Sequence, residues 1–405
     1  MTISLVNPAV FDWTGAMGLP EFERIDSTDF EPAFEVALDE NRHEIDAIAA
    51  SDDEPTFANT IDALELSGAK LARVSALFWN LVGADSDDVL RSVQTRIAPR
   101  LSRHASQTAM NAKLFARIET LWRRRDELDL NTERFRVLER TRKRFVRSGA
   151  ALPKAEQEEL AEVSARLSEL GARFSQNLLR DEREWFMPVE DEAVLAALPA
   201  SLRAVMAAAA RERAVDGHVV TTSRSVITPF LAACPDRELR REAFEAWTSR
   251  GARGGETDNR ALIEEILALR QRRAKLLGYR NFAEFKLEDQ MARRPAAVLE
   301  LLEEVWGHAV ARARDEEAAL AAKAAESGEA HDIAPWDWAF YTEKVRAERF
   351  SFDQAEVKPY LALENMLAAA FETASRLFGL SFREDRDTPR YHRDVRVFEV
   401  LNADG

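Results

Sequence analysis

Apolar residues recur at helical spacing along most of this sequence, and this periodicity limits the fold more than any other feature. The segment 154–183 carries one such stripe, and 56–81 carries another, formed by Ile61, Leu64, Leu71, Val74, Phe78 and Leu81. Stripes of this kind are typical of amphipathic helices that bury one face. We therefore predict a mostly α-helical protein whose N-terminal part is a helical bundle.

Glycine and proline mark where several of these helices begin and end. A helix is expected at 259–277, ended by Gly278 as a C-cap, and another begins at Pro295 and runs to about residue 325. Residues 1–25 are expected to form an irregular leader.

A few short strands are expected near 185–230 and at 395–401. Within the first region, 185–189 and 219–230 have strand-like composition. In the second, apolar side chains alternate around Arg396 with the two-residue period of a strand. The strand resembles a hairpin arm without its return strand, which leaves unpaired backbone groups. We therefore expect residues after about Tyr391 to be disordered or wrongly packed.

Composition excludes several classes of protein. A hydrophobic fraction of 46% is ordinary for a globular chain, and 405 residues allow two or more domains. The formal net charge of -15 disfavours binding to nucleic acid or to anionic membranes. The single cysteine, Cys234, rules out an internal disulfide and suits a reducing cytosol. The sequence shows neither a secretory signal nor an apolar run of the roughly 20 residues that cross a bilayer, so we expect a cytoplasmic protein.

Several short segments carry a family resemblance. They include Pro335-Trp336-Asp337-Trp338-Ala339-Phe340-Tyr341, Tyr391-His392-Arg393-Asp394-Val395-Arg396 and Phe145-Val146-Arg147-Ser148-Gly149-Ala150. Together they resemble the thimet oligopeptidase family of zinc metallopeptidases, and most of all its bacterial peptidyl-dipeptidase (Dcp) branch. The resemblance extends over nearly the whole chain.

The resemblance implies a two-lobed helical peptidase with a deep channel that admits short peptides, in which this chain is the N-terminal part. The intact enzyme would be monomeric and would bind Zn²⁺. We expect an N-terminal helical domain at 1–183 and a mixed strand and helix connecting region at 184–255. The helical start of the peptidase domain would follow at 256–405, truncated before the zinc-binding segment.

Zinc peptidases of this type place His-Glu-x-x-His on a helix, so that both imidazoles lie on one face. None of the six histidines has a second histidine four residues later. Those later positions hold Ala47, Thr108, Thr222, Arg312, Pro335 and Arg396. We therefore expect no catalytic, metal-binding or cofactor-binding residue in this chain, leave its substrate-binding residues unknown, and predict that it is inactive by itself.

Other candidate sites have simpler interpretations. His43-Glu44 begins like the zinc motif but supplies too few ligands, which favours a solvated helix face. The basic region 123–147 could bind an anion or RNA, but pairing with nearby acidic residues is favoured. The segment 251–255 lacks the spacing of a phosphate loop, and we interpret it as a hinge or a solvent loop.

The remaining candidates are a thiol and several rings. Cys234 is expected to be structural rather than nucleophilic. Trp336 and Trp338 could line a peptide site, although rings at this density more often close a core. His392, beside Tyr391, could face a substrate channel, but a surface position is favoured.

Two alternatives to the peptidase hypothesis stay open. The chain could be a non-catalytic helical module that binds peptides or a partner. It could also be one half of a split peptidase whose catalytic half is a separate polypeptide. Reading the coding DNA past Gly405 would separate these cases. An in-frame His-Glu-x-x-His makes this chain a fragment, a stop codon with a neighbouring frame that encodes the motif favours a split enzyme, and a stop codon without such a neighbour favours the binding module or a decayed gene.

Overall fold

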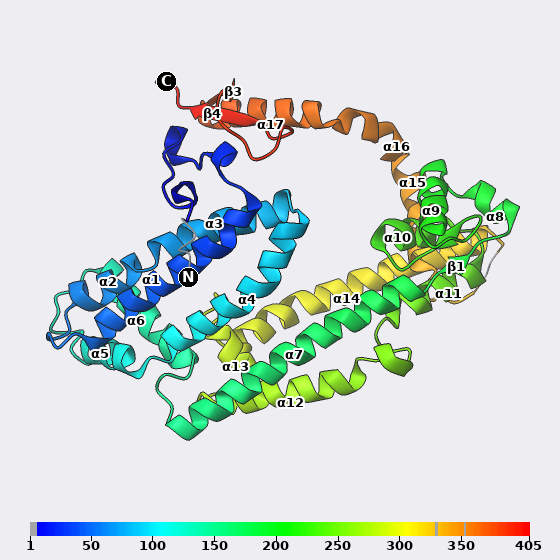
Figure 1. Ribbon diagram of the computed structural model, residues 1–405. Coiled ribbons are helices and arrows are strands. Elements are labelled where there is room, and N and C mark those ends of the chain that lie inside the picture. Colours follow the sequence, from blue (N-terminus) through cyan, green and yellow to red (C-terminus); the bar gives the residue numbers. More distant parts are fainter. Residues whose placement is uncertain (1–5, 329–330, 352–353) are drawn as a thin grey trace. The chain divides into compact units, whose positions relative to one another are not determined.

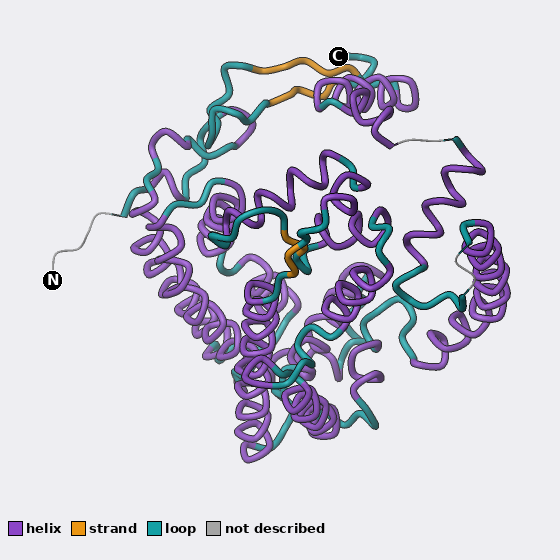
Figure 2. The backbone as a smooth tube through the Cα atoms, turned by 90° about the vertical axis from the view of Figure 1, so that its right-hand side faces the viewer, coloured by secondary structure: helices purple, strands orange, loops and turns teal. Residues whose placement is uncertain are grey.

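A computed structural model of the chain describes residues 6–328, 331–351 and 354–405. These residues are mostly α-helical, as predicted, and Figure 2 shows the strands as two separate short pairs. The chain divides into two compact units, residues 1–157 with 362–405, and residues 158–361. The first five residues of the expected leader lie outside the described part, and 3₁₀ turns dominate the rest of it.

The first unit begins with a helical bundle. Its helices are α1 (Phe30–Ala50), α2 (Ala63–Leu66), α3 (Ala69–Ala84), α4 (Asp88–Ala109), α5 (Ala112–Arg123) and α6 (Thr132–Arg147), with a π-helical turn η5 (Phe57–Asp62) before α2. The rings of Phe30 and Phe34 lie 5.3 and 5.2 Å from that of Phe78, so α1 and α3 share an aromatic core. The predicted bundle is therefore confirmed (Figure 1).

The stripe from Ile61 to Leu81 does not form one continuous helix. The chain turns at Gly68, whose φ of 74° and whose approach to Asn41 leave no room for a side chain. The Glu44 carboxylate accepts a hydrogen bond from the Gly68 amide at 2.7 Å. This contact ties the turn to α1 and lets both halves of the stripe face the core.

The second unit holds most of the remaining helices. They are α7 (Lys154–Glu184, which starts in the first unit), α8 (Glu192–Ala197), α9 (Ala200–Glu212), α10 (Arg224–Ala233), α11 (Arg237–Thr248), α12 (Arg260–Leu276), α13 (Phe282–Leu287), α14 (Pro295–Glu326), α15 (Trp338–Phe350) and α16 (Gln354–Val357). The helices expected at 154–183, 259–277 and from Pro295 agree with α7, α12 and α14 to within one or two residues. Gly278 has a φ of 83°, as a C-cap glycine requires.

The strand expected at 219–230 is mostly wrong. Only Val219–Val220 forms a strand, β2, which pairs antiparallel with β1 (Met187–Pro188). Residues 224–233 instead form α10, because Val226, Ile227 and Phe230 all lie on one buried helical face. Their β-branched composition resembles that of a strand, but the helical face allows this group to fill the core.

The last 44 residues form a helix and a hairpin that belong to the first unit. Helix α17 (Leu363–Phe378) precedes β3 (Ser381–Asp385), which pairs antiparallel with β4 (Val397–Leu401). The expectation that residues after Tyr391 are disordered or wrongly packed is therefore wrong, because β3 is the partner of the C-terminal strand. The Arg383 Nε atom donates to Glu399 at 2.7 Å across the pair.

The domain boundaries expected at 183 and 255 stay a prediction. The compact units group the chain by packing, and residues 362–405 return to the N-terminal bundle. One contact of this kind joins the rings of Phe22 and Tyr391, whose centroids lie 5.6 Å apart.

Candidate functional site

A buried ion-pair network surrounds Asp337, whose side chain has no exposed surface. The carboxylate accepts from Arg240 Nη2 at 2.9 Å and from Arg237 Nη2 at 2.8 Å. It also accepts from the Ala334 amide at 3.1 Å, and His331 Nε2 lies 3.4 Å away. We refer to Arg237, Arg240, His331 and Asp337 as the Asp337 cluster.

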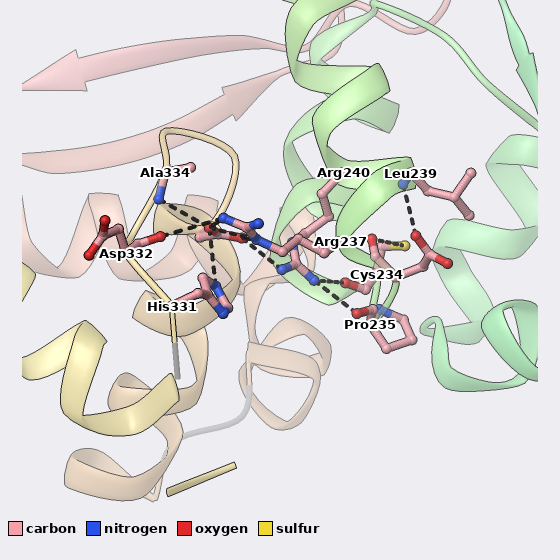
Figure 3. Close-up of polar contacts among 10 residues, drawn as sticks. Cys234, Pro235, Arg237, Leu239, Arg240, His331, Asp332 and Ala334 are labelled. Carbon is pink, nitrogen blue, oxygen red and sulfur yellow. Dashed lines mark hydrogen bonds and ion pairs between the residues drawn. The ribbon is translucent and has the colours of Figure 1, made fainter. Parts of the chain in front are cut away.

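Local helix geometry positions the two arginines. Arg237 and Arg240 are three residues apart in the first turns of α11, so they lie on the same face. Asp236 caps that helix by accepting from the Leu239 amide at 2.9 Å. Figure 3 shows both arginines extending from α11 toward the segment that carries His331 and Ala334. The cluster therefore joins α11 to the start of α15.

Arg240 is as enclosed as Asp337, because its side chain is also without exposed surface. Its Nη1 atom donates to the carbonyls of Cys234 and Pro235 at 2.9 and 3.0 Å. The guanidinium carbon lies 4.1 Å from the centre of the Phe340 ring. The charge is thus held by hydrogen bonds and by an aromatic face, as a buried arginine requires.

Electrostatics keep Asp337 ionised. Burial favours the neutral acid, but hydrogen bonds from Arg237 and Arg240 outweigh it and lower the pKa of Asp337. Both carboxylate oxygens already accept hydrogen bonds from arginine. A carboxylate held in this way is a poor general base, and its chemistry suits the positioning of α11 against α15.

The histidines occupy separate elements along the chain. His43 is exposed on α1, where its Nδ1 atom lies 3.6 Å from Asp39, while its neighbour Glu44 accepts a hydrogen bond from the Gly68 amide. His104 contacts Asn41, and burial lowers the pKa of its imidazole. Within the described residues, no group of three or more His, Cys, Asp or Glu side chains is arranged to hold a metal ion.

The basic region 123–147 lies on α5 and α6 and makes several ion pairs. Arg124 pairs with Glu54 and Glu127, and Arg142 donates to Glu119 at 2.7 Å. The acidic partners foreseen from the sequence are therefore present.

Cys234 is a buried thiol at the end of α10. Burial raises the pKa of its thiol to about 11, so the thiolate is scarce at neutral pH. The structural interpretation of this residue is supported.

The glycine-rich segment 251–255 is largely exposed, as expected for a solvent loop, but it is anchored at Gly251. Gly251 is buried, and its amide donates to Asp181 at 2.7 Å, while its carbonyl accepts from the Asn259 amide at 2.7 Å. The amide of Gly254 donates to Asp258. The chain's own carboxylates therefore take the donors that a phosphate loop would offer to a ligand.

Both aromatic candidates, Trp336 and Trp338, are partly buried and pack against other core side chains. Trp338 packs against the buried residues Leu320, Phe340 and Tyr341, as foreseen for a core ring. Trp336 contacts Phe244 edge-to-face.

His392 is partly exposed and lies beside Asp394, with 3.7 Å between the His392 Nδ1 atom and the carboxylate. Its position agrees with the surface interpretation.

Sequence reasoning did not identify the Asp337 cluster. The available signals were the spacing of Arg237 and Arg240 and a single carboxylate within an aromatic segment. Neither signal says that residues 97 and 100 positions apart along the chain meet in space.

The sequence of the chain is similar to those of known peptidases. Residues 230–405 match the profile of peptidase family M3. The chain is 36% identical over 405 residues to dipeptidyl carboxypeptidase of Escherichia coli, covering 100% of this chain and 60% of that protein. It is 30% identical to oligopeptidase A of the same organism, covering 95% and 57%, and 28% identical to a probable cytosolic oligopeptidase A of Arabidopsis thaliana, covering 95% and 56%.

The chain thus spans about three fifths of the length of the curated relatives it matches. Among the described residues, no helix is both long and apolar enough to cross a membrane. The family profile covers the whole Asp337 cluster, and the relatives align with both compact units. The chain is a member of the thimet oligopeptidase family, peptidase family M3, and lies close to the dipeptidyl carboxypeptidases.

Proposed function

We propose that this chain is the N-terminal helical part of a zinc-dependent oligopeptidase of the peptidyl-dipeptidase type, which hydrolyses short peptides in the cytoplasm. The observation that carries the proposal is the match to E. coli dipeptidyl carboxypeptidase along all 405 residues at 36% identity. Because the match covers 60% of that relative, we infer that zinc binding and peptide hydrolysis depend on polypeptide outside this sequence.

The side chains of this chain do not fit a catalytic zinc site. Two imidazoles one helical turn apart would be needed, and the six histidines are instead distributed over separate elements. We infer that the metal ligands and the general base come from another segment, and that the chain alone neither binds catalytic zinc nor hydrolyses peptides.

The role that remains for this chain is to form one lobe and part of a channel wall. A narrow channel selects substrates by size, because an unfolded short peptide enters and a folded protein does not. Such a wall must be rigid, and the Asp337 cluster fixes α11 to α15 within the part that matches the family profile.

Two proteins test this proposal. One is the 405-residue chain, and the other is a chimera in which the chain is continued by the part of E. coli dipeptidyl carboxypeptidase beyond the matched segment. Zinc is measured by elemental analysis, and turnover is measured with a fluorescence-quenched short peptide. We expect no turnover and no stoichiometric zinc for the chain, and one zinc with chelator-sensitive turnover for the chimera.

Stoichiometric zinc together with turnover by the chain alone would refute the proposed division of labour. A folded chimera with neither zinc nor activity would refute the peptidase assignment itself.

A further inference from the structure

The C-terminal layer, which we define as α17, β3 and β4, lacks a core of its own. Thr388 is the single buried residue among residues 362–405, and none of the sixteen residues of α17 is buried. A two-stranded hairpin is marginal in water unless further structure covers it. The layer is therefore an incomplete unit that needs additional polypeptide to cover it.

One face of α17 already covers the hairpin. The Phe371 ring stacks on Phe382 at 4.3 Å and meets Phe398 edge-on at 4.9 Å. Figure 1 shows α17 lying along both strands. The inner face is thus apolar, as expected for a helix that packs on a sheet.

The outer face of α17 is apolar as well. Its large side chains Leu363, Met366 and Leu377 are 72%, 46% and 69% exposed. Between them a groove of about 350 Å³ is lined mainly by small residues, among which Ala370 lies near the middle. The apolar stripe of α17 is therefore wider than the part that the hairpin covers, and an apolar stripe of this kind normally packs against further structure.

Strand β4 has a free edge, and the residues after β4 form a turn that leads toward that edge. Among the described strands, β4 pairs with β3 alone. After β4, the Gly405 amide donates to the Asn402 carbonyl at 3.0 Å, and Gly405 has a φ of 79°. A β-turn followed by a left-handed glycine is one of the common hairpin loops, and it directs the chain back along the strand that it has just left.

We propose that the C-terminal layer is the docking surface for the remaining part of the peptidase. A returning strand pairs antiparallel with the free edge of β4, and an apolar element of the same polypeptide covers the outer face of α17. This inference rests on the proposed function. Its occupant follows from three facts: the relatives are longer than this chain, the family profile extends through the layer, and the turn leads toward the free edge.

Cysteine labelling tests the contact directly. Ala370→Cys places a thiol in the groove, and the native Cys234 is buried with a raised pKa, so its background reaction is slow. A maleimide dye is applied at pH 7 to the chain and to the chimera described above. We expect Cys at position 370 to react at least tenfold more slowly in the chimera than in the chain.

A matched control uses Ala58→Cys, which lies at an exposed position of η5 in the same compact unit. Its labelling rate should be the same in both proteins.

Ala370→Arg supplies a second measurement, because it should leave the Tm of the chain unchanged and lower the Tm of the chimera by several degrees.

The outcomes separate this inference from the proposed function. A chimera that hydrolyses peptide, yet labels at position 370 as fast as the chain, overturns the docking surface and leaves the function standing. Protection at position 370 in the chimera that disappears on dilution also overturns it, because the occupant is then a second copy. Slow labelling in a chimera without activity supports docking and counts against the function.

Discussion

At the scale of single residues, Asp337 carries the clearest prediction. Asp337→Asn removes the negative charge and leaves Arg240 buried without a counter-ion. Breaking a buried ion pair from one side costs about 3–5 kcal/mol. We expect the free energy of unfolding, measured by urea titration at pH 7, to fall by about that amount.

The control for this substitution is Asp332→Asn, which changes an exposed carboxylate on the same segment. It should alter the free energy of unfolding by less than about 0.5 kcal/mol. Equal urea midpoints for the two variants would show that the Asp337 cluster adds nothing to stability.

The lowered pKa of Asp337 predicts how its contribution depends on pH. In the unfolded chain an aspartate has a pKa of about 3.9, and in the folded chain Asp337 stays ionised to a lower pH. Its stabilisation is therefore complete above the unfolded pKa and is lost as the pH falls through the folded pKa. The gap in unfolding free energy between the native chain and Asp337→Asn should be constant from about pH 7 to 5 and should shrink below about pH 4. A gap that widens in acid would contradict this assignment.

The sequence was more informative about which metal-binding pair is missing than about which residues meet in space. The residue four positions after each histidine can be read directly, so the absence of a His-x-x-x-His pair needs no structure. The meeting of Arg237 with Asp337 could not be predicted, because it depends on how helices separated by 100 residues pack. Helical periodicity identifies buried faces but does not identify their partners.

At the scale of elements, Gly251 tests how closely the loop before α12 is packed. Gly251→Ala would place Cβ 2.9 Å from Leu178 Cδ2 and 3.0 Å from Asn259 Nδ2, at a φ of 69°. Strain of about 1–2 kcal/mol from the left-handed backbone adds to an overpacking cost of about 1–3 kcal/mol. Gly278→Ala has a similar φ of 83° in open space, so it should cost only the backbone strain. Urea titration of both variants isolates the packing term, and equal losses would show that the loop yields freely.

Long helices were the most predictable elements. Residues 154–183 repeat the apolar stripe many times, and α7 follows that prediction almost to the residue. Short elements failed for identifiable reasons. Strand β3 reads Ser-Phe-Arg-Glu-Asp, with a single apolar residue, so its sequence shows little strand pattern. Its stability comes from pairing with β4 and from the contact of Phe382 with α17, both of which are tertiary.

At the scale of the whole molecule, exposed apolar side chains predict self-association of the isolated chain. Besides the outer face of α17, helix α14 exposes Leu302 and Trp306 by 57% and 70%. Patches of this kind mark interaction surfaces, and they are opposed only by the repulsion of a net charge of -15.

Sedimentation velocity should therefore show association that grows with protein concentration. Added salt should strengthen it, because salt screens charge repulsion and leaves apolar contact intact. Trp306→Lys and Leu377→Lys should each weaken the association, whereas Ala58→Lys should not. Association that instead weakens with salt would show that ion pairs, and not these apolar faces, hold the copies together.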